Sequence, residues 1–130
     1  TSKTVLTERN YLAEAQARQH YLVIDEPLDA GGDDNAPTPV EYLLTAVGGC
    51  VAITLRMYAE RKGWDLGKIE VNVTQKEELT SGGIRKSLVE EISFEKEVTP
   101  EQKEKLLEIA AKCPVVRLIK NETVINSTIK

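Results

Sequence analysis

The stretch TPVEYLLTAVGGCVAITLRMYAERKG, residues 38–63, decides the fold of this chain. It opens with the pattern of a helix start, in which Thr38 is the N-cap, Pro39 is the first helical residue and Glu41 reaches back to the cap. It closes with two cations followed by Gly63, a common helix end. We therefore predict one long helix over residues 39–62.

Charge is missing from the first half of this predicted helix. Residues 42–55 are uncharged on every face, whereas a helix at a protein surface shows a single apolar stripe. These 14 residues fall short of the roughly 20 that a helix needs to cross a bilayer. We therefore predict a helix that is buried on all sides within protein, and no membrane partner.

The segment before the helix divides into strands and a loop. Residues 4–7, 11–17 and 21–25 have β-type composition and predict a small antiparallel meander. Residues 26–39 are rich in Pro, Gly and Asp and predict a long loop. Five acids lie between Asp25 and Asp34, but their spacing is not that of an EF-hand, so we predict a solvated acidic loop.

The segment after the helix begins with two alternating runs, residues 68–77 and 87–98, which predict a β-hairpin with its turn at Ser81-Gly82-Gly83. Thr99-Pro100 repeats the helix-start pattern, and Pro114 breaks or restarts the second helix. Residues 123–129 predict a last strand. We expect one α+β domain over residues 1–130, with two helices and mostly antiparallel sheet.

Size and charge exclude several classes of protein. A chain of 130 residues suits a single core. Its 17 Lys and Arg against 21 Asp and Glu give a net charge of −4, which offers no basic field for phosphates. We expect no nucleic-acid partner. No signal-peptide pattern opens the chain, so we expect a cytoplasmic protein.

The two cysteines, Cys50 and Cys113, are the residues most able to carry chemistry. With a single His and no C-x-x-C, the chain predicts neither a metal site nor a cofactor. The lack of a C-x-x-C motif and the deep burial expected for Cys50 also disfavour an oxidoreductase that acts on protein disulfides. Two interpretations remain open, a pair of buried structural thiols and a redox-active pair.

Sequence context supports the redox interpretation. Gly48 and Gly49 precede Cys50 within the helix, and each costs about 1 kcal/mol relative to Ala. Such glycines usually allow another backbone or a substrate to come close. Cys113 precedes Pro114, which forces it off helical geometry at the end of an element.

Residues 36–63, with their Gly-Gly-Cys, together with the downstream IAAKCPV of residues 109–115, resemble the OsmC/Ohr family of organic hydroperoxide reductases. The resemblance covers nearly the whole chain. It implies a thiol peroxidase built as an intertwined homodimer, in which the long helices pack inside two sheets and each subunit interface holds an active site. It also implies that Cys50 is the peroxidatic thiol and Cys113 the resolving thiol.

In the chemistry that the resemblance implies, the Cys50 thiolate attacks an organic hydroperoxide, an alcohol leaves, and the resulting sulfenic acid condenses with Cys113 to a disulfide. An external dithiol then reduces that bond, and the family suggests lipoylated proteins for this role. If peroxidase activity is absent, the alternative is a non-catalytic homodimeric module that binds a hydrophobic small molecule and keeps its cysteines as packing residues.

The family also uses an Arg from the N-terminal strands, anchored by a Glu at the start of the long helix. Arg9 and Arg18 are both candidates for the Arg. The family's Glu stands ten residues before the Cys, a position that Val40 occupies here, whereas Glu41 stands nine before Cys50, half a circle away on a straight helix. Glu41 is therefore a candidate both for catalysis and for helix capping alone.

Overall fold

The computed structural model describes all 130 residues, which form two compact units, residues 1–43 and 44–130. Helix α1, Pro39–Lys62, begins in the first unit and continues into the second. Its bounds agree with the predicted helix, and Gly63 ends it with a φ of +71°. The architecture is α+β with antiparallel strands and a long helix, as predicted.

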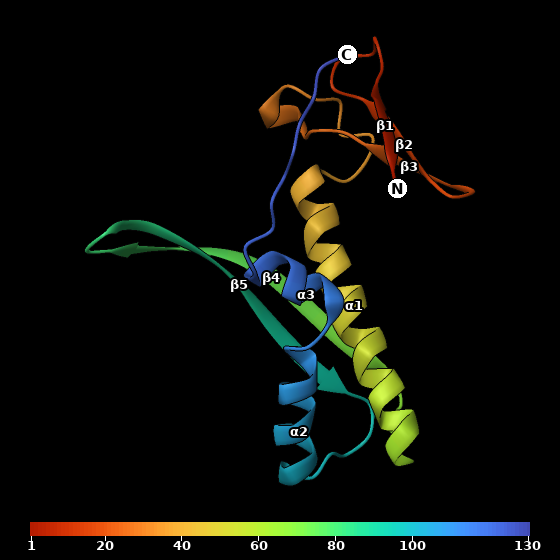
Figure 1. Cartoon of the computed structure of the whole chain (residues 1–130), viewed down its shortest axis with the longest axis vertical. Helices are drawn as coiled ribbons and strands as arrows, with labels where there is room; N and C mark the ends of the chain where they lie inside the picture. The colour runs from red at the N-terminus through yellow and green to blue at the C-terminus, as the bar shows by residue number, and fades with distance from the viewer. The chain divides into compact units, whose positions relative to one another are not determined.

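The first unit contains a three-stranded antiparallel sheet in the order β1-β2-β3, formed by β1 (Lys3–Leu6), β2 (Ala13–Ala17) and β3 (His20–Ile24) (Figure 1). This confirms the predicted meander. Arg18 and Gln19 make the turn between β2 and β3, where Ala17 pairs with His20. Arg18 has a φ of +53°, a conformation that Asn and Gly adopt more easily.

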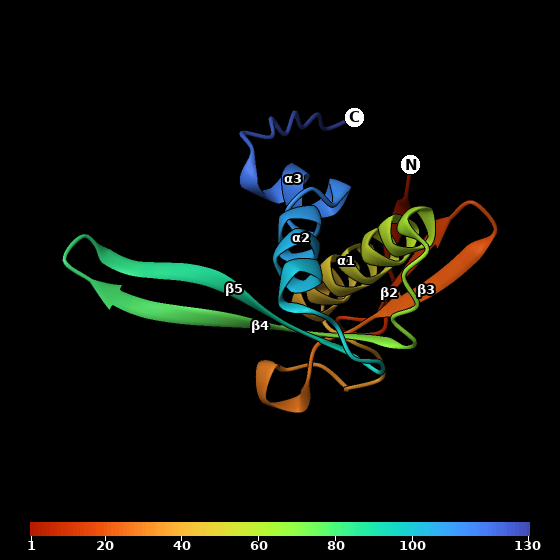
Figure 2. The ribbon, with the colours of Figure 1, turned by 90° about the horizontal axis from the view of Figure 1, so that it is seen from below.

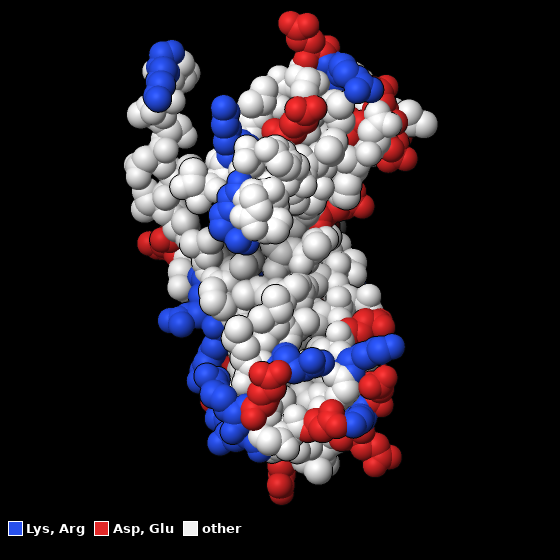
Figure 3. Space-filling view, turned by 90° about the vertical axis from the view of Figure 1, so that its right-hand side faces the viewer, with Lys and Arg blue, Asp and Glu red and all other residues white.

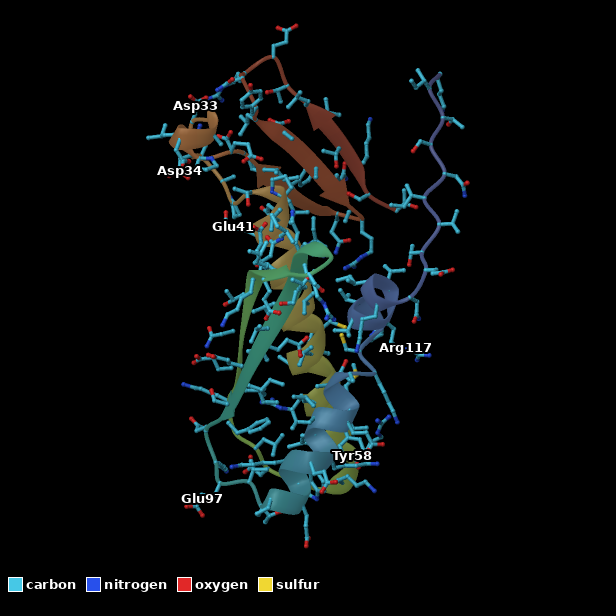
Figure 4. All side chains as sticks on the ribbon, turned by 90° about the vertical axis from the view of Figure 1, so that its left-hand side faces the viewer. Asp33, Asp34, Glu41, Tyr58, Glu97 and Arg117 are labelled. Atoms are coloured by element: carbon cyan, nitrogen blue, oxygen red, sulfur yellow. The ribbon has the colours of Figure 1, made fainter.

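A loop with one short 3₁₀ helix, η1 (Leu28–Ala30), connects β3 to α1. Asp33 and Asp34 lie exposed on this loop (Figure 4). Asp25, however, is only 1% exposed, and its carboxylate accepts hydrogen bonds from the N–H groups of Glu26 (2.8 Å) and Asn35 (3.1 Å). The predicted solvated acidic loop is therefore wrong for Asp25, because its carboxylate holds the two ends of the loop together.

Replacing Asp25 by Asn should destabilise the first unit at neutral pH. Hydrogen bonds from the N–H groups of Asn35 and Glu26 lower the pKa of Asp25 below its ordinary value. A lowered pKa stabilises the fold above the unfolded carboxyl pKa of about 3.9, and this stabilisation is lost as the pH falls through the folded pKa. Urea unfolding should show a gap between wild type and Asp25→Asn at pH 7 that closes in acid.

The matched control for this prediction is Asp34→Asn, an exposed position on the same loop with a φ of +54° that Asn tolerates. It should unfold like the wild type at both pH values. A gap for Asp25→Asn that is equally wide at pH 7 and at pH 3 would show that the charge of Asp25 is not what stabilises the loop.

The second unit is built on the hairpin of β4 (Ile69–Thr80) and β5 (Gly83–Phe94), whose two-residue turn places Thr80 opposite Gly83. Helices α1, α2 (Pro100–Ala110) and α3 (Pro114–Lys120) lie on one face of the hairpin, and the turn end extends away from them (Figures 1 and 2). The buried core is made by apolar side chains of the helices and of the α1–β4 connection, namely Val47, Val51, Leu55, Tyr58, Ala59, Leu66, Leu106, Ala110 and Cys113.

Helix α1 buries only one face in the single chain. Ile53 is 59% exposed and Met57 is 58% exposed, so the expectation of a helix buried on all sides is wrong for one chain. Figure 3 shows the side of the molecule on which α1 lies, and no charged side chains cover the middle of the helix there. Helix α1 is also long and apolar enough to cross a membrane, although core helices of soluble proteins meet the same criterion. In its most apolar stretch of 18 residues, 22% of the residues are buried.

The C-terminal part differs from the prediction in two ways. Of the two outcomes left open at Pro114 the chain restarts a helix, so it has three α-helices instead of the expected two. Residues 121–130 form no strand, and Val124 (78%) and Ile125 (85%) are exposed. The alternating composition of this tail suits a strand, but no neighbouring strand pairs with it.

Candidate redox site

The second unit brings the two cysteines together from opposite ends of its sequence. Cys50 lies three turns into α1, and Cys113 is the N-cap of α3, directly after α2. Both thiols are free, and they lie close enough together that Cys50 contributes to raising the pKa of the Cys113 thiol.

The surroundings of the two sulfurs differ. Cys113 is completely buried, whereas Cys50 is half-buried. Burial raises the pKa of the Cys113 thiol, contact with Cys50 raises it further, and the N–H groups of Val116 and Val115 lower it. The Val116 nitrogen lies 3.4 Å from Cys113 Sγ. None of these groups is a cation, so a cation that activates the site has to come from elsewhere.

The two glycines before Cys50 have different neighbours. A Cβ at Gly48 would lie 3.5 Å from Val73 Cγ2 and 3.6 Å from the Val71 carbonyl oxygen, so this glycine faces β4. A Cβ at Gly49 would meet nothing within 4 Å. The expected close approach of another backbone is therefore found at Gly48, while the single chain gives no reason for Gly49.

Glu41 forms the predicted capping box at the beginning of α1 (Figure 4). Its Oε1 accepts a hydrogen bond from the Thr38 N–H at 2.9 Å, and its own N–H donates to Thr38 Oγ1 at 3.1 Å. Thr99 and Gln102 form the same box at α2. Capping thus accounts for Glu41 locally, and its catalytic role stays a prediction.

The two candidate arginines, which belong to the first unit, have different local roles there. The charge of Arg9 contributes to lowering the pKa of Asp25, after the backbone N–H groups that have the larger effect. Arg18 takes part in none of the ion pairs of the chain, although its carbonyl accepts a hydrogen bond from Gln16 Nε2 at 2.9 Å. The guanidinium of Arg18 is therefore uncommitted within the chain.

A cavity of about 630 Å³ lies between the hairpin, α2 and α3, and residues close in sequence to both cysteines line it, although the cysteines themselves do not. Val47, one turn before Cys50, and Ala110 and Val116, three residues on either side of Cys113, line it together with Leu107 and Ile119. Arg85, Lys120 and Glu90 add charge to its wall, and burial raises the pKa of Glu90. The cavity wall thus combines apolar and polar surface in similar shares.

One component of the site was not foreseen, the N–H of Val116 as a donor to Cys113. A backbone group leaves no residue-type signal, but Cys113-Pro114 has the order of cap and first-turn proline that begins a helix. That order could have predicted α3 and its donor. No group of three or more His, Cys, Asp or Glu side chains is arranged to hold a metal ion.

The fold agrees with the comparisons to known proteins. Residues 31–128 match the family model of OsmC-like proteins, and the chain belongs to this family. No match was found among curated protein sequences.

Several solved structures share the fold. A protein of Psychrobacter arcticus 273-4, provisionally assigned to the osmotic stress and detoxification response, is 22% identical, with 90% of this chain and 85% of that chain covered and a TM-score of 0.76. An OsmC-like protein of Mycoplasma pneumoniae is 20% identical (94% and 87% covered, TM-score 0.72). The organic hydroperoxide resistance protein OsmC of Legionella pneumophila is 18% identical (95% and 90% covered, TM-score 0.69).

Proposed function

We propose that this protein is a cysteine-based peroxidase that reduces organic hydroperoxides to alcohols in oxidative-stress defence. The observation that carries the proposal is the closeness of two free thiols, Cys50 and Cys113, near a cavity that Val47, Ala110 and Val116 help to line. Membership in the OsmC-like family supports it, since a structural relative from Legionella pneumophila is an organic hydroperoxide resistance protein.

The difference in burial supports Cys50 as the peroxidatic thiol and Cys113 as the resolving thiol. Cys50 is the cysteine of the pair that retains exposed surface, so its thiolate attacks one peroxide oxygen and the O–O bond breaks. The alkoxide takes a proton and leaves as the alcohol, and Cys50 becomes a sulfenic acid. The Cys113 thiol then displaces water from this sulfenic acid to give the disulfide, which an external dithiol reduces.

The cavity favours organic hydroperoxides over hydrogen peroxide. Five apolar side chains of its wall, Val47, Leu107, Ala110, Val116 and Ile119, can take up the organic group of the substrate. Hydrogen peroxide has no apolar group to bury there. The test is hydroperoxide consumption by the reduced protein with a dithiol, in which cumene hydroperoxide should be consumed much faster than hydrogen peroxide.

We assign the activating cation to Arg18. A guanidinium about 4 Å from the thiolate contributes about 4 kcal/mol at an effective dielectric constant near 20. Neither Arg18 nor Arg9 forms an ion pair, but Arg18 occupies a backbone conformation that is uncommon for Arg, and the charge of Arg9 acts on Asp25. Strained, uncommitted residues of this kind are typical of functional sites.

We also propose that the functional unit is a homodimer in which α1 contacts a second copy. Ile53 and Met57 are exposed on α1, and Gly49 faces open space. Leu79 and Ile84, a cross-strand pair near the hairpin turn, are 89% and 67% exposed. Apolar surface of this extent usually belongs to an interface.

Replacing Gly49 by Ala should weaken the dimer about tenfold or more, because a methyl group would overfill a close helix crossing. Gly48→Ala is the matched control, since its Cβ makes only ordinary contacts with β4. In the absence of a dimer each substitution should stabilise the fold by about 1 kcal/mol through helix propensity. Sedimentation equilibrium decides, and equal dissociation constants for the two variants would contradict a crossing at Gly49.

The cavity also suits the alternative, a non-catalytic module that binds a hydrophobic small molecule. The two functions differ in what Cys50→Ser does. A binding module would keep its ligand affinity and show no hydroperoxide turnover before or after the substitution. A peroxidase would lose its turnover.

A further inference from the structure

The two sulfurs of the redox pair differ in how an external thiol can reach them. Cys113 is 0% exposed and belongs to the buried core of the second unit, whereas Cys50 only packs against that core and keeps part of its surface in solvent. Thiol–disulfide exchange depends on access and on which of the two sulfurs is attacked. The difference in burial therefore bears on how the oxidised protein is reduced.

The direction of attack makes the difference larger. A thiolate approaches a disulfide sulfur from the side opposite to the sulfur that leaves. An approach to Cys113 would have to pass through the core, because no part of its side chain reaches solvent. Cys50 retains exposed surface, so an approach to it can start from solvent, and it expels the Cys113 sulfur, which belongs to the buried core.

The buried side already contains a donor for the departing sulfur. The Val116 N–H points at Cys113 Sγ from 3.4 Å. Burial disfavours a thiolate at Cys113, and a hydrogen bond from this N–H favours it and strengthens when the sulfur becomes charged. Val116 is thus placed to act as a positioning residue through its backbone.

We propose that an external thiol reduces the Cys50–Cys113 disulfide by attacking the Cys50 sulfur, and that the Val116 N–H holds the Cys113 thiolate as it leaves. The thiolate of the reductant forms a new S–S bond to Cys50, and the electron pair of the old bond goes to Cys113. A second thiol of the reductant then attacks the mixed disulfide and releases Cys50 as a thiolate. The reductant is oxidised to a disulfide and the protein recovers two thiols.

The inference rests on the disulfide of the proposed function, but its test does not need peroxide. The wild-type disulfide is formed with diamide, mixed with excess glutathione, quenched in acid at intervals and alkylated, and the peptides are mapped by mass spectrometry. We expect glutathione on Cys50 and the alkyl group on Cys113. Glutathione on Cys113 would overturn the inference, whereas failure of peroxide to form the disulfide would count against the proposed function instead.

A pair of variants at one position tests the positioning role. Val116→Pro removes the N–H, and Val116→Ala keeps it with a smaller side chain. We expect reduction of the disulfide by glutathione to be about tenfold slower in Val116→Pro than in Val116→Ala, which keeps the N–H. In a Cys50→Ser background, the pH profile of Cys113 alkylation should move to higher pH only with Val116→Pro. Equal profiles for both variants would show a merely structural role.

Discussion

Replacing Cys50 by Ser should abolish the reduction of organic hydroperoxides, with a loss of at least about a thousandfold, as for other enzymes that lose their nucleophile. A Ser hydroxyl stays protonated at neutral pH and cannot attack the O–O bond as a thiolate does. The fold should survive, because Cys50 is half-buried and lies at the edge of the core. The measurement is the rate of cumene hydroperoxide consumption with dithiothreitol as reductant.

Cys113→Ser is the matched control, because it removes the second thiol and keeps the first. This variant should still react once with cumene hydroperoxide, and Cys50 should then accumulate as a sulfenic acid that a dimedone-type reagent labels. A Cys50→Ser protein that still consumes hydroperoxide at the wild-type rate would contradict the assignment of Cys50 as the nucleophile.

Replacing Arg18 by Ala should slow the reaction of Cys50 with cumene hydroperoxide by about 10²- to 10³-fold. A cation about 4 Å from the thiolate contributes about 4 kcal/mol at an effective dielectric constant near 20, and each 1.36 kcal/mol changes a rate tenfold. Alkylation of Cys50 by iodoacetamide should slow as well, since it also needs the thiolate. Rapid-mixing kinetics on the reduced protein give both rates.

Arg9→Ala is the control for Arg18, because it removes a guanidinium from the same unit. It should leave the reaction with peroxide near the wild-type rate and act instead on the loop that Asp25 holds, where Arg9 adds to the lowering of the carboxyl pKa. If Arg9→Ala abolishes reactivity and Arg18→Ala does not, the activating cation is Arg9.

Local sequence patterns predicted the elements that depend on neighbours along the chain. The Thr38–Glu41 and Thr99–Gln102 capping boxes and the glycine after Lys62 set the bounds of α1 and the beginning of α2, and the alternating runs predicted the hairpin. Each of these elements depends on contacts between residues a few positions apart, so the local sequence is sufficient to predict it.

Features that depend on distant partners could not be read in the same way. The absence of charge in α1 predicted burial on all sides, yet one chain covers only the face that carries Val47, Val51 and Leu55. The tail after Asn121 has strand-like composition but no strand to pair with. Both errors arise because the composition of a segment indicates the environment that it prefers. It does not indicate whether the same chain or another molecule provides that environment.

The redox site also combines features that the sequence predicted with features that it could not predict. The resemblance to the OsmC/Ohr family paired Cys50 with Cys113, and in the structure Cys50 lies close enough to affect the pKa of Cys113, while the disulfide between them stays a prediction. The sequence could not predict which carboxylate of the acidic loop is buried. Asp25 differs from its neighbours only in the hydrogen bonds that it accepts from backbone N–H groups. The Val116 donor is likewise a backbone group that no residue type reveals.

The most direct measurement is the thiol state of the protein after one equivalent of cumene hydroperoxide. The reduced protein is treated, alkylated under denaturing conditions, digested and analysed by mass spectrometry. A peroxidase of the proposed kind predicts loss of both thiols and a single disulfide that joins the Cys50 and Cys113 peptides, together with one equivalent of cumyl alcohol. Alkylation of both cysteines with the hydroperoxide left intact would contradict it.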